Sequence, residues 1–336
     1  MTTKQIISIT YLRAIAVCLI FICHICYISH HFPLSMWFNT GVPLFFIISA
    51  YLMSMKSFDM ERSVSHFYKK RAMSILVPYE IYLLFIIVIT SVAGRGPSMK
   101  GVIMYITALS GFTNGGVLGM GHLWFITVLF ICYSITPLLY IVYSMESPRK
   151  KYIILLGLIC QFLFFLLCGF PAYGIHVGSY CLVYLFFLNN QRRITFKVLT
   201  AWGITAIFLS IIRLFLDSPI MAGDYTIYYY YDALFQPIAR FSIAMTMFCS
   251  FICCDASFVK WGNKHTKIDS VIKWFSGISY EFYLTHQFIM LAIWEFFPQV
   301  HDNIGLLVWI TSSFILTLVN AELLNLVCTR VIKQFK

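Results

Sequence analysis

Long apolar runs separated by short basic segments dominate the pattern of this chain. A helix needs about 20 predominantly apolar residues to cross the hydrocarbon core of a bilayer. Ten stretches approach or reach that length, and each predicts a membrane-spanning helix. They are Ile6–Ser29, Phe38–Met55, Ser74–Val92, Leu123–Tyr143, Tyr152–Phe170, Tyr173–Leu188, Phe196–Leu216, Ala233–Cys254, Phe275–Phe296 and Leu306–Cys328. The pattern therefore predicts an all-α, polytopic transmembrane bundle.

The longest connection, Ala93 to His122, is rich in glycine. Its apolar part, Gly101–Phe112, is too short to span and predicts an interfacial or re-entrant piece. We expect the whole connection to form a mobile flap over the outer membrane face.

Composition excludes a soluble protein. The 336 residues are 60% hydrophobic and only 11% charged, whereas soluble domains carry about 25% charged residues. A net charge of +11 would favour nucleic acid in a soluble chain, but here the cations lie between apolar runs, so no nucleic-acid partner is expected. Most of the 11 cysteines lie inside these runs, which predicts small buried apolar side chains rather than a disulfide framework.

The distribution of basic residues predicts the orientation. With the N-terminus in the cytoplasm, only Arg95 and Lys100 of the 24 Lys and Arg residues fall in outer loops, and Arg13, Arg213 and Arg240 fall inside spans. Cytoplasmic loops of membrane proteins carry the excess of Lys and Arg. The charge pattern therefore predicts an even number of spans with both termini in the cytoplasm of a multi-pass plasma-membrane protein.

Ionisable residues inside spans are costly and are candidates for function. Arg13 and His24 are eleven positions apart, which puts them on nearly one helix face, about 16 Å apart along the axis. This stripe carries a cation near the inner end and a proton acceptor near the outer end. Each residue has a structural alternative. Arg13 could extend to the inner lipid headgroups as an anchor, and His24 could be a hydrogen-bonded packing residue. Arg240 needs a partner, for which Glu295 is a candidate, and a structural ion pair is the expected role.

Four blocks of the sequence resemble, in order, the signatures of the acyltransferase-3 family of integral membrane acyltransferases. They are Tyr11–Val17 followed by His24; Gly41–Leu52; His122–Ile126 with Tyr133 and Pro137; and Ile278–His286. The chain departs from the family pattern at Pro43 and Ala50, where Asp and Gly are usual, and at Ser74, where a second Arg is usual. These departures concern the loop that binds the donor in the family.

The resemblance implies that residues 1–336 form a single membrane acyltransferase domain. It implies acetyl-CoA as the usual acyl donor and a carbohydrate hydroxyl as the acceptor, as in the short, stand-alone surface-glycan O-acetyltransferases. It marks His24 and Arg13 as the catalytic pair. We expect the anionic end of CoA to dock on Arg13 and the cluster Lys69, Lys70 and Arg71. Candidates for contact with the acceptor are His122, Trp124, Tyr283 and His286, each of which has a structural alternative.

A second class of function fits the same pattern. A transporter or flippase for a lipid-linked glycan or an anion would also place Arg and His inside ten spans. No repeat symmetry or pair of broken helices supports it.

Cys23 and Cys26 flank His24 without a second ligand pair, so no metal is expected. The identity of the glycan and the oligomeric state are not encoded in any recognisable pattern.

Overall fold

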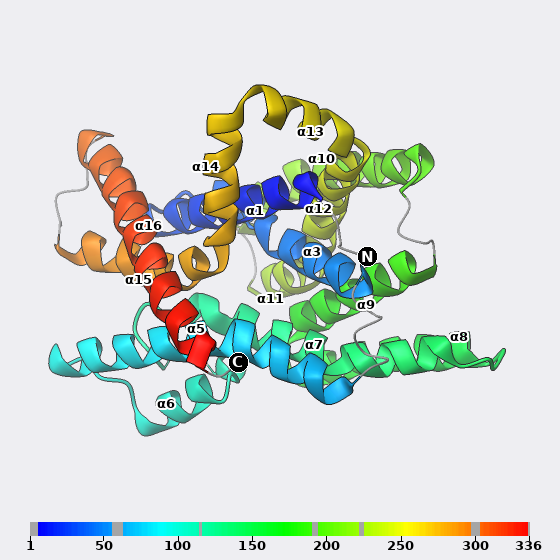
Figure 1. The fold of residues 1–336 in the computed structure, drawn as a ribbon, viewed down its shortest axis with the longest axis horizontal. Coiled ribbons are helices and arrows are strands. Elements are labelled where there is room, and N and C mark those ends of the chain that lie inside the picture. Colours follow the sequence, from blue (N-terminus) through cyan, green and yellow to red (C-terminus); the bar gives the residue numbers. More distant parts are fainter. Residues whose placement is uncertain are drawn as a thin grey trace.

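The computed structural model describes residues 6–55, 63–113, 116–189, 194–221, 225–296 and 303–334. Every regular element within these ranges is a helix, so the predicted all-α bundle is confirmed (Figure 1). Six of the 24 Lys and Arg residues counted above lie outside the described residues: Lys4, Lys56, Arg62, Arg192, Arg193 and Lys336.

Long helices follow the predicted apolar runs. They are α1 Ile7–Ile28, α3 Gly41–Met55, α5 Val64–Val92, α7 Trp124–Ser144, α8 Lys150–Leu167, α9 Pro171–Asn189, α10 Phe196–Met221, α12 Gln236–Cys253, α15 Ser279–Phe296 and α16 Asn303–Gln334. Shorter elements connect them: α2 Phe32–Phe38, α6 Met99–Ile106, η1 Ser110–Phe112, η2 Gly121–Leu123, α11 Tyr225–Tyr230, the π-helical η3 Tyr231–Phe235, α13 Asp255–Lys264 and α14 Thr266–Gly277.

Nine helical segments within the described residues are long and apolar enough to cross a membrane. The remaining predicted span, Phe275–Phe296, is divided at Ile278 between the end of α14 and α15. α15 begins beside Arg13 of α1 and reaches His286 where α1 reaches His24, so it runs parallel to α1. α16 packs against α15 and runs in the opposite direction. Trp274 of α14, just before the start of α15, donates to Glu322 in the second half of α16. This geometry gives α15 the path of a crossing helix.

α1 lies at the centre of the bundle. It packs against α2, α3, α12, α13, α14 and α15, and most of its side chains are buried. α8 and α10 lie toward the periphery in Figure 1, and few of their side chains are buried. The exposed apolar surface of these outer helices suits contact with lipid chains, whereas α1 has a protein neighbour on most sides.

The connection between α5 and α7 differs from the flap that its glycines predicted. In the described part of this segment, α6, η1 and η2 pack onto the bundle. Tyr79 of α5 donates to the carbonyl of Tyr105, and Tyr105 donates to the carbonyl of Met120. Met120 is fully buried. Hydrogen bonds from two buried tyrosines therefore hold this connection against the bundle end.

Two expected details are wrong. Arg240 does not pair with Glu295: it lies 3.7 Å from Asp232 and donates to the carbonyl of Met36, while Glu295 pairs with Arg95. The basic segment before the third span is also not a loop, since α5 begins at Val64. Successive residues on a helix point in directions about 100° apart, so Lys70 and Arg71 cannot face the same neighbour.

A hydrogen-bonded cluster fixes α14 against the start of α1. Tyr11 donates to Asp269 at 2.7 Å, and Lys273 donates to the same carboxylate at 2.6 Å. The hydrogen bond from Lys273, reinforced by that from Tyr11, holds the pKa of Asp269 below its ordinary value. A carboxyl with a lowered folded-state pKa stabilises the fold above its unfolded pKa, and that contribution is lost as the pH falls through the lowered value.

We expect Gly41→Ala to destabilise the bundle. A Cβ atom at Gly41 would lie 2.5 Å from the carbonyl oxygen of Ala16 and 2.8 Å from Ile20, and backbone of a central helix cannot move aside cheaply. Overpacking costs about 1–3 kcal/mol, more than the ~1 kcal/mol that alanine gains over glycine in a helix. Thermal unfolding in detergent measures the change. The matched control is Gly157→Ala in α8, which meets nothing within 4 Å and should leave the midpoint unchanged or raise it.

Candidate active site

Two cavities lie side by side within the core of the bundle. The first, called here the arginine cavity, has a volume of about 370 Å³. Its polar walls come from five helices: Arg13 (α1), Ser49 (α3), Arg71 and Ser74 (α5), Tyr133 (α7), Tyr280 and Glu281 (α15). The second, called here the histidine cavity, has a volume of about 340 Å³ and is bordered by His24, Asn39, His122, Trp124 and Gln287 among others.

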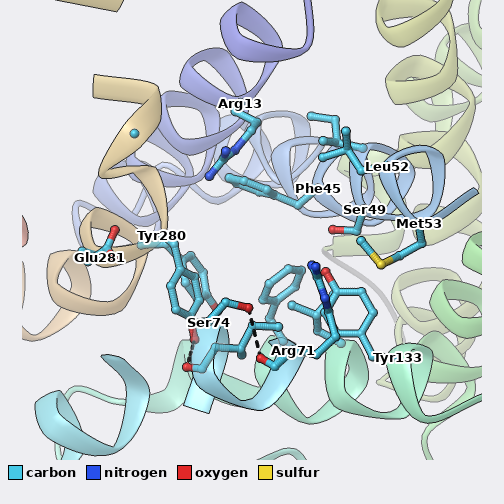
Figure 2. A pocket seen from close by; sticks show the side chains of 16 residues that line it. Arg13, Phe45, Ser49, Leu52, Met53, Arg71, Ser74, Tyr133, Tyr280 and Glu281 are labelled. Carbon is cyan, nitrogen blue, oxygen red and sulfur yellow. Dashed lines mark hydrogen bonds between the residues drawn. The ribbon is translucent and has the colours of Figure 1, made fainter. Parts of the chain in front are cut away.

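The arginine cavity carries net positive charge. Arg13 and Arg71 point into it from opposite sides, one from α1 and one from α5 (Figure 2). Arg13 donates to Ser279 at 3.1 Å, whereas Nε of Arg71 is buried without a hydrogen-bond partner. Glu281 supplies a single carboxyl on the same wall, and its Oε2 is likewise unpartnered. Two guanidinium groups against one carboxyl favour an anionic ligand, because guanidinium pairs with phosphate and carboxylate in forked geometry.

The predicted CoA-binding cluster is divided by the geometry of α5. Arg71 faces the arginine cavity, while Lys69 borders a neighbouring cavity of about 740 Å³ between α5 and α7. Lys70 is exposed. The two cavities meet at Arg71, Ile75 and Tyr133. Arg13 and Arg71 are therefore brought together, whereas the two lysines lie outside the arginine cavity.

Three histidines from three elements meet beside the histidine cavity. The rings of His24 and His286 are 4.9 Å apart, those of His122 and His286 are 4.8 Å apart, and those of His24 and His122 are 6.1 Å apart. Within the part of the chain that the structure describes, no group of three or more His, Cys, Asp or Glu side chains is arranged to hold a metal ion. The contact between the rings is consistent with neutral imidazoles.

Hydrogen bonds fix the orientation of two of these rings. Nε2 of His122 donates to the carbonyl of Leu284 at 3.2 Å, and Nδ1 of His286 donates to the carbonyl of Tyr283 at 2.6 Å. A carbonyl only accepts, so these nitrogens carry the protons. The other nitrogens of both rings, and Nδ1 of His24, are buried without partners. This leaves Nε2 of His24 as the ring nitrogen of the cluster that can face the cavity.

The predicted acceptor-binding residues occupy different positions. His122, Trp124 and Tyr283 border the histidine cavity. Trp124 stacks on Tyr173 at 5.3 Å and on His176 at 5.7 Å. His286 is only 1% exposed and lies against His24 and His122. From this position His286 can orient the other two imidazoles. Direct contact between His286 and an acceptor stays a prediction.

Sequence reasoning missed several polar residues of the two cavities. Glu281 was quoted only as part of a block, although a carboxyl inside a predicted span carries the same signal that identified Arg13. Gln287, which accepts a hydrogen bond from the backbone of His122 at 2.9 Å, lies one residue after the quoted block. Asn39 follows the short helix α2 and carries no signal in the sequence that would distinguish it from an ordinary helix cap.

Fold and cavities together define a polytopic helical membrane protein with charged and polar groups enclosed in its core. A family model described as an acyltransferase domain matches residues 6–323, nearly the whole chain. The chain therefore belongs to the acyltransferase-3 family of integral membrane acyltransferases, as the four sequence blocks indicated. Comparison with curated proteins and with solved structures gives no match.

We expect His24 to react with diethylpyrocarbonate much faster than His122 or His286. The reagent needs an accessible unprotonated ring nitrogen, and the side chains of His122 and His286 are 4% and 1% exposed with their nitrogens hydrogen-bonded or buried. Peptide mass spectrometry after brief labelling of the folded protein measures each site. Exposed His66 serves as the positive control, and equal labelling of all three clustered histidines would contradict the described packing.

Proposed function

We propose that this protein transfers an acyl group, most simply acetyl, from cytoplasmic acyl-CoA to a hydroxyl of a surface polysaccharide or its lipid-linked precursor. The plasma membrane is the proposed location. One observation carries the proposal: a cavity with two guanidinium groups adjoins a cavity bordered by His24, whose Nε2 is not among the buried nitrogens without partners. The first suits an anionic donor, and the second suits the proton chemistry of an attacking hydroxyl.

The donor end of the proposed site is the arginine cavity. Arg13 and Arg71 would bind phosphate or other anionic groups of the donor, with Lys69 and Lys70 attracting it as it approaches from the cytoplasm. The flexible pantetheine arm would extend along α1. Its thioester would then approach the level of His24, eleven residues further along the helix.

His24 is the proposed catalytic residue. As a general base, its Nε2 takes the hydroxyl proton while the acceptor oxygen attacks the thioester carbonyl; the C–S bond breaks and the proton passes to the CoA thiolate. As a nucleophile, Nε2 attacks the thioester carbonyl and forms an acyl-imidazole while the C–S bond breaks and CoA leaves as thiolate. The acceptor hydroxyl then attacks the acyl group, which breaks the C–N bond and restores the imidazole, and its proton passes to the thiolate. Both routes need a neutral imidazole with an open nitrogen. His122, Trp124 and Tyr283 would contact the acceptor, and His286 would orient His24.

We expect His24→Ala to lower acyl transfer by about 10²–10⁴-fold, the usual contribution of a positioned general base, while the protein still accumulates in the membrane. The measurement uses purified protein, labelled acetyl-CoA and membranes that carry the acceptor. The matched control is His265→Ala, which changes a partly buried histidine that caps the end of α13 and borders neither cavity, and it should keep full activity. Full activity in His24→Ala would remove the mechanism, and a carrier would show no thioester turnover in either protein.

We expect Arg13→Gln and Arg71→Gln each to raise the KM for acetyl-CoA by roughly 10–100-fold, because a hydrogen bond to a charged group contributes about 1.5–3 kcal/mol. Initial rates over a range of acetyl-CoA concentrations measure the effect. Lys151→Gln in α8, an exposed cation placed over the Tyr152 ring, is the control and should leave KM unchanged. A KM that stays at the wild-type value in both arginine variants would place the donor elsewhere.

Mass spectrometry of surface glycans from cells with and without the protein tests the acceptor. The proposal predicts that glycans from cells without the protein are lighter by about 42 Da for each missing acetyl ester, because hydrogen then replaces the acetyl group. A strain that carries only His24→Ala should lose the same mass. Retention of the ester in both strains would mean that the acceptor belongs to another class of molecule.

A further inference from the structure

The arginine cavity and the histidine cavity share two aromatic walls. Phe125 of α7 and Tyr283 of α15 border both of them. The centroids of the two rings are 5.2 Å apart, and the planes meet at 63°. The two residues are 5% and 3% exposed. Arg13 and His24 therefore face two adjoining cavities, with this pair of rings between them.

Phe125 is held by aromatic packing from α3. Its ring centroid lies 4.8 Å from that of Phe46 and 6.1 Å from that of Phe45. Phe46 in turn stacks on His176 at 5.2 Å. A buried aromatic ring with these neighbours cannot swing away without leaving a void, which costs several kcal/mol in a packed core.

Tyr283 is held by hydrogen bonds. Its hydroxyl donates to the backbone carbonyl of His122 at 2.5 Å, and its own carbonyl accepts from Nδ1 of His286. Rotation of the ring would leave the carbonyl of His122 without this donor in a buried region. The residue therefore joins the histidine cluster to the aromatic wall and fixes the ring in place.

We propose that Phe125 and Tyr283 form a partition that limits the acyl group reaching His24 to a short one, such as acetyl. The inference rests on the proposed function. A thioester that approaches from the arginine cavity must bring its acyl group past these two rings to reach Nε2 of His24. Each added methylene must pass alongside two rings that are held in place by their neighbours, and a closely packed site excludes additional bulk by steric overlap.

Phe125→Ala tests the partition. Membranes that carry the acceptor are incubated with purified protein and labelled acetyl-CoA or butyryl-CoA, and label in the glycan and release of CoA are both measured. One methylene in an apolar site changes kcat/KM by about 10–200-fold. We therefore expect wild-type protein to favour acetyl over butyryl by at least tenfold, and Phe125→Ala to reduce that preference by at least tenfold.

Phe282→Ala is the matched control. Phe282 precedes Tyr283 on α15, is fully buried, and packs against Phe21, Phe275 and Phe314 on the other side of the helix. It borders neither cavity. The control removes the same volume from the same region, so it should lower thermal stability to a similar degree and leave the ratio of acetyl to butyryl transfer unchanged.

Phe125→Leu supplies the measurement if the alanine variant does not accumulate as folded protein. It keeps much of the apolar volume and removes the ring, so a smaller change in the same direction is expected. An unchanged acetyl-to-butyryl ratio in a folded Phe125 variant overturns the partition, as does wild-type protein that transfers both groups equally. Both results leave acyl transfer intact. An absence of thioester turnover with either donor in wild-type protein instead overturns the proposed function.

Discussion

The central position of α1 is the constraint on which the rest of the structure depends. The hydrocarbon core of a bilayer offers no water to polar groups, so Arg13 and His24 must be enclosed by protein. α1 is surrounded by α2, α3, α12, α13, α14 and α15, and the close approach of α3 at Gly41 leaves no room for a side chain there. Enclosing polar groups in this way creates cavities whose walls come from several helices.

The placement of charge along α1 separates two kinds of environment. At one level two guanidinium groups and a single carboxyl border the same cavity. At the other, three imidazoles lie in ring contact, and carbonyl groups fix the protons of two of them. A cation suits the binding of an anion, and a neutral imidazole with one open nitrogen suits proton transfer. The separate roles proposed for Arg13 and His24 rest on this difference in how the helix is surrounded.

Aromatic residues give the site its shape. Phe125 and Tyr283 stand where the two environments meet, and each is immobilised by a different means, Phe125 by packing and Tyr283 by hydrogen bonds. Gln287 also helps to hold this region in place, since its side chain accepts a hydrogen bond from the backbone of His122. Arg240 has a structural role. It lies 3.7 Å from Asp232 and donates to the carbonyl of Met36, which ties α12 to the short helix α2.

The sequence alone determined the fold class, the main helices and the family, because apolar runs of membrane length and local signatures need no knowledge of neighbours. It also placed Arg13 and His24 on one helical face, since that depends only on the helical repeat. Tertiary structure decided what those side chains meet. Glu281 and Gln287 of α15 and Phe125 of α7 come from helices that are far from α1 in the chain. Neighbouring helices enclose the polar groups of α15, His286 among them, and no local pattern records that enclosure.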